Sequence, residues 1–404
     1  MASPNSSFPI SILDRRIRPP HILITSGEHI MTWLTILTVT LTLFIPPSAN
    51  NFNGNEAETN SHSSPEDGLS VEQSRVRTGS VCPILMYDSD VGFGFGGKGI
   101  IKNLFYRDES FDLMIFGSSK GEQEYDLVFS IPDHQFRQGT SYPMSCDVQL
   151  EFKKVLKSNF FGFGNDSADN DWQFPKETAI VSVTVGRAFT PEIIGEFSIQ
   201  YLHGSIYDFE ENRVMTRSTP GGGESNTAMV ACDIRWDTRT NCIHPENGTI
   251  AGFGIDLADT DFGSDYTFQR YRFELGRYIP AFIPRHVLAG RLWLHHVDGD
   301  CPYFKQSMLG GGNTMRGFKA DRFVDTTMSL VSLESRFMVH YPLSTVLFVD
   351  SGRVYSGIDE ITLKDWKIDT GFGLRYHLDD FIVRLDTGFS TEGTRIFFNF
   401  GHVF

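Results

Sequence analysis

Apolar and polar side chains alternate along most of the chain from residue 80 onward. Residues 366–378 read WKIDTGFGLRYHL, where Trp366, Leu374 and the other even-numbered residues are mostly apolar. Asp369 and Arg375 belong to the odd-numbered set, which is polar or glycine. Because successive side chains of a strand point to opposite faces, this segment predicts a strand with one apolar and one polar face. The pattern recurs in residues 146–153, 269–276 and 381–389.

Turn residues divide this region into sixteen such runs, with eleven before an irregular stretch and five after it. The predicted strands are 81–88, 91–103, 111–118, 122–131, 144–154, 178–188, 192–203, 227–236, 248–257, 266–278, 286–297, 325–340, 344–355, 366–378, 381–390 and 394–404. Several of them approach or exceed the roughly 9 to 11 tilted residues that cross a bilayer. No helical period of 3.6 interrupts the series.

Two all-β architectures use alternating strands of this kind. A soluble sandwich would place the apolar faces of two sheets against each other. The strand length, the even count and the opposite charges along the polar faces favour a membrane barrel instead. The expected fold is therefore all-β: a transmembrane antiparallel β-barrel of sixteen strands, with a long inward-folded loop before the last five.

The first eighty residues lack this pattern and predict two further segments. Residues 33–45 (WLTILTVTLTLFI) have the length of a signal-peptide apolar region, and small residues follow near Ala49. Residues 1–49 therefore predict an export signal, with Met31 as a second possible start and an amphipathic or anchoring segment as the alternative. Residues 50–80 are rich in Asn, Ser, Glu and Gly, which predicts a disordered periplasmic linker. The barrel is expected over residues 81–404.

Composition excludes two broad classes of protein. The chain carries 35 Lys and Arg against 50 Asp and Glu, a net charge of −15, so a nucleic-acid partner is not expected. Spanning helices need roughly 20 consecutive apolar residues, and the 33–45 segment, the only candidate, is too short. A mean hydropathy of −0.19 fits the alternating strands of a barrel.

No constellation for catalysis or cofactor binding stands out. Residues 92–99 (GFGFGGKG) have the spacing of a phosphate loop, but Gly99 follows Lys98 where magnesium binding needs Ser or Thr. The five cysteines form no CxxC pair and GxSxG is absent. We therefore expect no enzyme activity, metal or cofactor. Cys242 and Cys301 lie in predicted loops, where an oxidising compartment would permit a bridge.

The irregular stretch is the most informative part of the sequence. Residues 298–323 (DGDCPYFKQSMLGGGNTMRGFKADRF) make a loop far longer than a hairpin needs, and such loops are usually functional or disordered. Its methionines, leucine and phenylalanines predict that it packs against protein. A folded-in loop would bury Arg316, and a buried arginine must be paired. Glu334 and Asp350 lie on the polar faces of the next two predicted strands.

These motifs resemble a known family. LGGGNTMRGF is similar to the inward-folded loop of the bacterial surface antigen superfamily, the outer-membrane assembly and translocation barrels of the BamA and TamA type. LFVDSGRVY, GFGLRYHL and VRLDTGF resemble later strands of that family, FFNFGHVF its C-terminal signal, and WDTRTNCIHPENGTIAGF its aspartate-arginine turn. The resemblance covers most of residues 81–404 and is strongest after Trp236.

The resemblance assigns roles to two groups of residues. Arg316, within the Arg316, Gly317 and Phe318 segment, corresponds to the loop arginine, with Glu334 and Asp350 as its acidic partners. We interpret this set as a structural latch that holds the loop in the lumen. Phe398, Phe400, Gly401 and Phe404 correspond to the C-terminal assembly signal. We also expect Ile396, Phe398, Phe400 and Phe404 to face lipid as one apolar ribbon, with His402 near the membrane interface.

Two functions remain open at this point, and a third, an outer-membrane lipase or protease, is disfavoured because no catalytic constellation is found. Family members with known activity carry periplasmic POTRA domains, which we do not find here, so fold transfers better than function. The first function is assistance of protein or lipid insertion or translocation at the bacterial outer membrane, through a weak seam between the first and last strands. The second is a structural surface antigen or narrow plugged channel. Expected partners are outer-membrane lipids, the barrel assembly machinery and outer-membrane protein clients.

Overall fold

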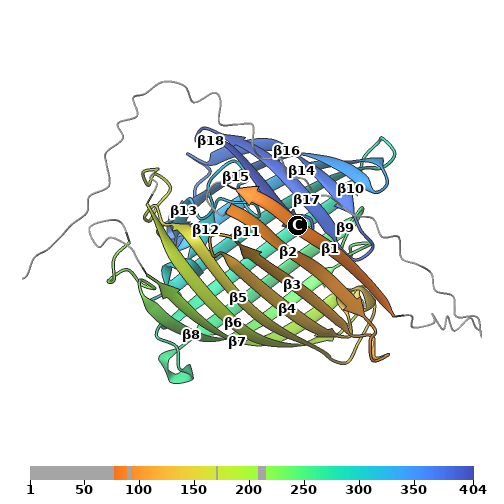
Figure 1. Cartoon of the computed structure of the whole chain (residues 1–404), viewed down its shortest axis with the longest axis horizontal. Coiled ribbons are helices and arrows are strands. Elements are labelled where there is room, and N and C mark those ends of the chain that lie inside the picture. Colours follow the sequence, from red (N-terminus) through yellow and green to blue (C-terminus); the bar gives the residue numbers. More distant parts are fainter. Residues whose placement is uncertain (1–76, 89–91, 170–171, 208–214) are drawn as a thin grey trace, which may run out of the picture. The chain divides into compact units, whose positions relative to one another are not determined.

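One antiparallel sheet of sixteen strands makes up almost the whole of the described chain (Figure 1). This computed structural model describes residues 77–88, 92–169, 172–207 and 215–404. The strands of the sheet are β1 (Thr78–Asp88), β2 (Gly92–Lys102), β3 (Ser110–Ser118), β4 (Gln123–Ile131), β5 (Ser145–Asn159), β6 (Gln173–Ala188), β7 (Ile193–Ile206), β8 (Glu224–Asp237), β9 (Gly248–Ala258), β10 (Phe268–Pro280), β11 (His286–Gly299), β14 (Thr327–His340), β15 (Leu343–Tyr355), β16 (Lys367–His377), β17 (Ile382–Ser390) and β18 (Gly393–Phe400). The predicted count and order of strands are confirmed.

Short elements occupy the connections. They are the helix α1 (His134–Arg137), the small strands β12 (Ser307–Leu309) and β13 (Phe323–Asp325), and 3-10 turns at Thr260–Phe262, Tyr303–Lys305 and Ile358–Glu360. Among the described residues, no helix is long and apolar enough to cross a membrane. The predicted export signal and residues 50–76 of the predicted linker lie outside the described residues. Residues 78–80, the end of that predicted linker, instead begin β1.

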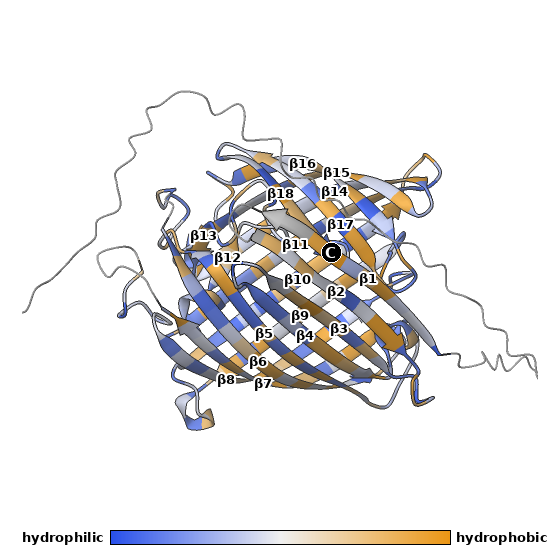
Figure 2. Cartoon of the chain, viewed as in Figure 1, coloured by the Kyte–Doolittle hydropathy of each residue, from blue (hydrophilic) through white to orange (hydrophobic). Residues whose placement is uncertain are grey.

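Hydropathy alternates along the strands as the sequence indicates (Figure 2). On β15 the outward side chains Leu347 and Val349 are 64% and 41% exposed, whereas Phe348 and Asp350, which alternate with them, are buried. A soluble sandwich would bury the apolar set. Exposed apolar side chains around a sheet that buries charges inside are what a lipid-facing barrel requires. This distribution decides between the two architectures.

The connections differ at the two ends of the sheet. We call the end where β1 begins and β18 ends the near end, and the opposite end the far end. The longest near-end connection is residues 132–144, whereas residues 300–326 leave the far end between β11 and β14. Because such barrels have short periplasmic turns and longer external loops, we expect the near end to face the periplasm.

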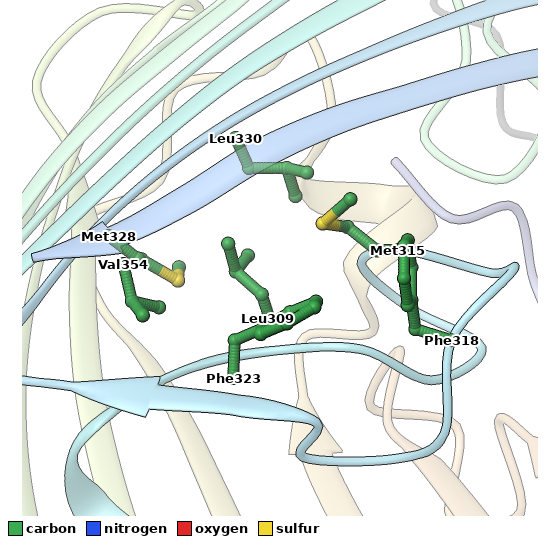
Figure 3. Packing of buried hydrophobic residues seen from close by; sticks show 7 residues of the cluster. All are labelled: Leu309, Met315, Phe318, Phe323, Met328, Leu330 and Val354. Carbon is green, nitrogen blue, oxygen red and sulfur yellow. The ribbon is translucent and has the colours of Figure 1, made fainter. Parts of the chain in front are cut away.

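The long far-end connection folds into the lumen, as predicted. Its side chains Leu309, Met315, Phe318 and Phe323 form a buried cluster with residues of β14 and β15 (Figure 3). β12 and β13 pair with each other within this loop. The apolar residues that the sequence places in the loop are therefore a core rather than a lipid-facing surface.

The two edge strands of the sheet are not hydrogen-bonded to each other. β1 pairs with β2 and β18 with β17, and among the described strands no ladder joins β1 to β18. The edges meet through side chains instead. Cys82 and Ile100 form a buried cluster with Phe381, against which Val383 and Phe400 pack. We call this contact of β1 and β2 with β17, β18 and the 378–381 turn the seam.

The seam is an overlap of two layers. Cys82 and Ile100 are buried and lie on the side of β1 and β2 that faces inward, opposite the exposed Val81 and Ile101. The ammonium of Lys98, on the same inward side, lies 5.7 Å from the centroid of the Phe400 ring. The last strands therefore lie behind the first hairpin, which covers part of their outer face.

The C-terminal residues depart from our expectation. β18 ends at Phe400, and the next residue, Gly401, has φ +77° and donates its backbone N–H to the Ile382 carbonyl. The side chain of Phe404 then packs on Tyr278 in the lumen. The predicted strand to residue 404 is wrong, because the chain leaves the strand at Gly401. Phe400 and Phe404 do not face lipid as predicted, because the first hairpin covers Phe400 and Phe404 lies in the lumen, whereas Ile396 of the predicted ribbon is 39% exposed.

Candidate functional site

Glycines shape the tip of the inward loop. Gly310 and Gly311 have φ values of +115° and +95°, a region that side chains other than glycine rarely adopt. Thr314 closes the turn, since its hydroxyl donates to the Gly310 carbonyl and accepts from the Gly310 N–H. The chain then turns back over buried Met315 and presents Arg316 to the wall formed by β14 and β15.

Arg316 is fully buried and holds both of the acids that the sequence singles out. Its Nε and Nη2 donate to the two carboxylate oxygens of Asp350 at 2.8 and 3.0 Å. Its Nη1 donates to Glu334 Oε1 at 2.5 Å. The guanidinium also lies 3.5 Å from the centroid of the Phe348 ring. Bidentate pairing and a stacked aromatic ring are the contacts that a buried arginine needs.

The electrostatic environment keeps Arg316 charged. Burial by itself would lower the pKa of the guanidinium, but the carboxylates of Glu334 and Asp350 outweigh burial and raise the pKa above the ordinary arginine value. The loop is therefore held by a permanent charge at every physiological pH.

Further charges extend this ion-pair cluster to the last strands. Asp386 on β17 lies 3.5 Å from Arg316 and accepts from Arg375 of β16 at 2.6 Å. Arg336 donates to the second oxygen of Glu334 at 2.7 Å. We call the set Arg316, Glu334, Asp350, Arg375 and Asp386, with Arg336, the lumen network.

Sequence reasoning missed the later members of this network. Alternation already placed Arg375 and Asp386 on polar faces, which was the available signal. Their contact depends on strand register: Asp386 lies opposite Gly373, two residues before Arg375. A single sequence does not specify that register.

Two glycines allow the loop backbone to touch the barrel wall. A Cβ on Gly388 would lie 2.1 Å from the Arg316 carbonyl oxygen, and one on Gly317 would lie 2.5 Å from the Cβ of Asp369. Ser390 donates its hydroxyl to the Gly317 carbonyl at 2.7 Å. Phe318, the last residue of the predicted set, is buried in the loop cluster of Figure 3. β17 is thus a backbone support for the loop.

The predicted C-terminal set is split between two places. Phe398 and Phe400 line a cavity of about 310 Å³ at the seam, together with Ile84 and Lys98 of the first hairpin. Gly401 makes the turn, and Phe404 lies in the lumen against Tyr278. The structure therefore brings Phe404 to the lumen wall rather than to the position of a strand residue.

The five cysteines build no disulfide, and they belong to no metal site among the described residues. All five cysteines are free thiols, and Cys242 and Cys301 lie in connections at opposite ends of the sheet, so the bridge considered from sequence is wrong. In the part of the chain that the structure describes, no group of three or more His, Cys, Asp or Glu side chains is placed to hold a metal ion.

Comparisons with known proteins identify the family. Residues 103–404 match the model of the Omp85 superfamily domain. The chain is 24% identical over 352 residues to the outer membrane protein assembly factor BamA of Nitratidesulfovibrio vulgaris, a match that covers 82% of this chain and 41% of that protein. The chain thus spans less than half the length of this relative.

Two solved structures share the fold. BamA from Haemophilus ducreyi lacking POTRA domains 1–3 superposes with a TM-score of 0.55 at 15% identity, over 80% of this chain and 70% of that chain. CdiB from Escherichia coli superposes with a TM-score of 0.58 at 11% identity, over 80% and 62%. The resemblance drawn from the loop and strand motifs is confirmed. The chain belongs to the Omp85 superfamily and is a β-barrel of the bacterial outer membrane.

Proposed function

We propose that this barrel assists the insertion or translocation of proteins or lipids at the outer membrane, and that it does so without enzymatic chemistry. The observation that carries the proposal is the seam, where β1 and β18 form no backbone ladder. An unpaired strand edge presents N–H and C=O groups that can pair with an added strand. A barrel with such an edge can offer a template to a client strand.

The forces that hold the seam are modest. Lys102 forms an ion pair of 2.8 Å with Asp380, and the Ser80 hydroxyl contacts the same carboxylate. One apolar cluster and the ammonium of Lys98 over the Phe381 and Phe400 rings add to these contacts. A backbone ladder elsewhere in the sheet adds a hydrogen bond every residue or so along its length. Separation of β1 from the last strands therefore disrupts only side-chain contacts, which fits an opening that a client could exploit.

The lumen network has a structural role in this proposal. Arg316 joins the loop to β14 and β15, and its backbone joins β17 through Gly388. The loop thus braces the strands next to one side of the seam. We assign Arg316, Gly317, Phe318, Glu334 and Asp350 to this latch, which keeps the lumen filled while the seam remains free to move.

The family resemblance also suggests how the protein reaches the outer membrane. Residues 1–49 would direct export, and residues 50–76 would form a periplasmic linker. The cell's barrel assembly machinery would recognise the C-terminal signal before the barrel closes. This signal comprises Phe398, Phe400, Gly401 and Phe404. The exposed apolar belt would contact outer-membrane lipids. Clients would be other outer-membrane proteins or lipids.

Deletion and rescue test the proposal. Outer-membrane proteomes are compared for a deletion strain and for strains rescued by wild type, by Arg316→Ala and by Lys319→Ala, with the abundance of this barrel checked in each. Loss of a set of outer-membrane proteins, restored by wild type and Lys319→Ala but not by Arg316→Ala, supports the assembly function. If no other protein changes, the function is wrong. Stable single-channel conductance would then favour the plugged channel.

A further inference from the structure

The last four residues of the chain, Gly401 to Phe404, cross from the seam to a different part of the lumen wall. We call them the tail. The side chain of Phe404 lies against buried Tyr278 of β10 and buried Val287 and Ala289 of β11, with Ile250 of β9 beside it. In the sheet, β15, β16 and β17 separate even the nearest strand of this region, β14, from β18. The tail therefore links the edge strand to a distant wall.

The wall has the composition of a binding pocket for an aromatic residue. The Phe404 and Tyr278 ring centroids are 6.3 Å apart. The guanidinium groups of Arg291 and Arg336 lie 5.7 and 5.1 Å from the Phe404 centroid. The apolar side chains bury the aromatic ring, and the two guanidinium groups add cation–π attraction.

The same two arginines also bind the backbone of the tail. Arg291 Nη1 donates to the Val403 carbonyl at 3.0 Å, and Arg336 Nη2 donates to the Phe404 carbonyl oxygen at 2.9 Å. Both side chains are more than nine-tenths buried. Arg336 Nη1 has no hydrogen-bond partner among the described residues. The pocket thus combines a ring site with buried donors for successive peptide carbonyls, which is a site for a peptide that carries an aromatic residue.

A second contact fixes the middle of the tail. The His402 and His244 ring nitrogens, Nε2 and Nδ1, are 3.1 Å apart, and the two rings stack with centroids 5.4 Å apart. His244 belongs to the near-end connection between β8 and β9. A cavity of about 340 Å³ lies beside the tail and reaches Lys98 and Ile100 at the seam. Free space therefore adjoins the tail on its seam side.

We infer that the wall of β10, β11 and β14 is a receptor pocket for an aromatic residue on a peptide, and that the chain's own Phe404 fills it. This self-binding holds the end of β18 inward, behind the first hairpin, and thereby keeps the seam shut. A competing peptide with an aromatic residue, or loss of the ring, frees the tail and allows β1 to separate from the last strands. The inference deepens the proposed function and rests on it for its biological meaning.

Distances across the seam test the inference without any client. Spin labels are placed at Leu85 of β1 and Ile368 of β16, which are 53% and 57% exposed. The five native cysteines are first changed to alanine, and the barrel is studied in lipid nanodiscs. Phe404→Ala should add a population with a longer label-to-label distance. Phe389→Ala, which removes an exposed aromatic of β17, is the matched control and should leave the distances unchanged.

A peptide experiment needs no destabilising variant. The free peptide Gly-His-Val-Phe, added to the labelled protein with its native tail, should increase the longer-distance population in a saturable manner, and Gly-His-Val-Ala should not.

Ala289→Phe places a second aromatic ring in the pocket from the barrel wall. This variant should therefore show the longer distance without peptide and should not respond to added peptide. Equal effects of the two peptides, or an unchanged distribution in both Phe404→Ala and Ala289→Phe, would overturn the inference. A negative proteome result would overturn the proposed function alone.

Discussion

At the scale of single residues, the buried guanidinium of Arg316 holds the inward loop to β14 and β15. Arg316 is 0% exposed and has carboxylates on both sides, from Glu334 and Asp350. The pairing of Arg316 with these two acids could be predicted from the sequence, because alternation shows that both acids lie on the polar faces of their strands. The bidentate geometry and the stacked Phe348 ring could not, because they depend on the path of the loop.

Removal of the Arg316 charge should destabilise the barrel. Arg316→Ala leaves two buried carboxylates without their main partner, a change that typically costs about 3 to 5 kcal/mol. We expect less of the folded form that resists heating in gel electrophoresis, and Arg316→Glu should be worse. Lys319→Ala, whose ion pair with Asp169 is partly exposed, should change little. Unchanged heat resistance and protease resistance in Arg316→Glu would contradict the latch.

A methyl group at Gly388 should displace the loop. The new Cβ would lie 2.1 Å from the Arg316 carbonyl oxygen, closer than any real contact, so loop or strand must move. We expect faster proteolysis within residues 300–326 and a loss of about 1 to 3 kcal/mol, the usual range for overpacking. Gly117→Ala in β3 is the control, because a Cβ there meets nothing within 4 Å. Equal proteolysis of the two variants would refute the close-contact argument.

At the scale of elements, the strands follow directly from alternation and turn residues. All sixteen predicted runs overlap a strand of the sheet, and the inward loop lies between the eleventh and twelfth of these strands. The tail could not be predicted in the same way. Ile396, Phe398, Phe400 and Phe404 share one parity, but parity loses its meaning once the chain turns at Gly401. The packing of β1 and β2 over β18 could not be predicted either, because it is a tertiary contact that the local sequence pattern does not encode.

Acid should loosen the tail. Burial lowers the pKa of His244 below the ordinary value of 6.5 and lowers that of His402 well below it. The charged and titratable groups around the pair are Glu246, Arg336, Arg375 and His377. A released tail binds protons near pH 6.5 whereas the bound tail does not. The bound state is therefore most stable above pH 6.5 and loses stability as the pH falls from 6.5 toward the lowered pKa values of the bound histidines.

The mobility of a spin label at position 403 measures this effect. A Val403→Cys label should be immobile at pH 7.5 and increasingly mobile as the pH falls from 6.5 to 5. The same label in a His244→Gln background should respond less steeply, because one of the titrating groups is gone. Equal mobility at pH 7.5 and pH 5 would show that the histidines do not hold the tail.

At the scale of the whole molecule, the loop and the tail share one network. Glu334 accepts from Arg316 of the loop and from Arg336, and Arg336 binds the Phe404 carbonyl. Both β18 and the inward loop are therefore connected to β14.

A double-mutant cycle measures the coupling between loop and tail. Arg316→Ala removes one hydrogen-bond partner of Glu334. This changes the environment of Arg336 and weakens its hydrogen bond to the Phe404 carbonyl oxygen. The longer-distance population across the seam in Arg316→Ala with Phe404→Ala should therefore differ from the sum of the single effects by an interaction energy of at least about 0.5 kcal/mol. Strict additivity would mean that the loop and the tail act independently.

A reversible disulfide across the seam tests whether the barrel functions by opening there. Ser80 and Asp380 face each other there through a hydroxyl–carboxylate contact. Ser80→Cys with Asp380→Cys, in a cysteine-free barrel, would join β1 to the turn before β17 by a disulfide. The measurement is the recovery of outer-membrane proteins in a deletion strain that carries this variant, under oxidising and reducing conditions, with each single cysteine variant as control. We expect that formation of the disulfide abolishes this recovery and that reduction restores it. Full recovery with the disulfide formed would contradict a function through the seam.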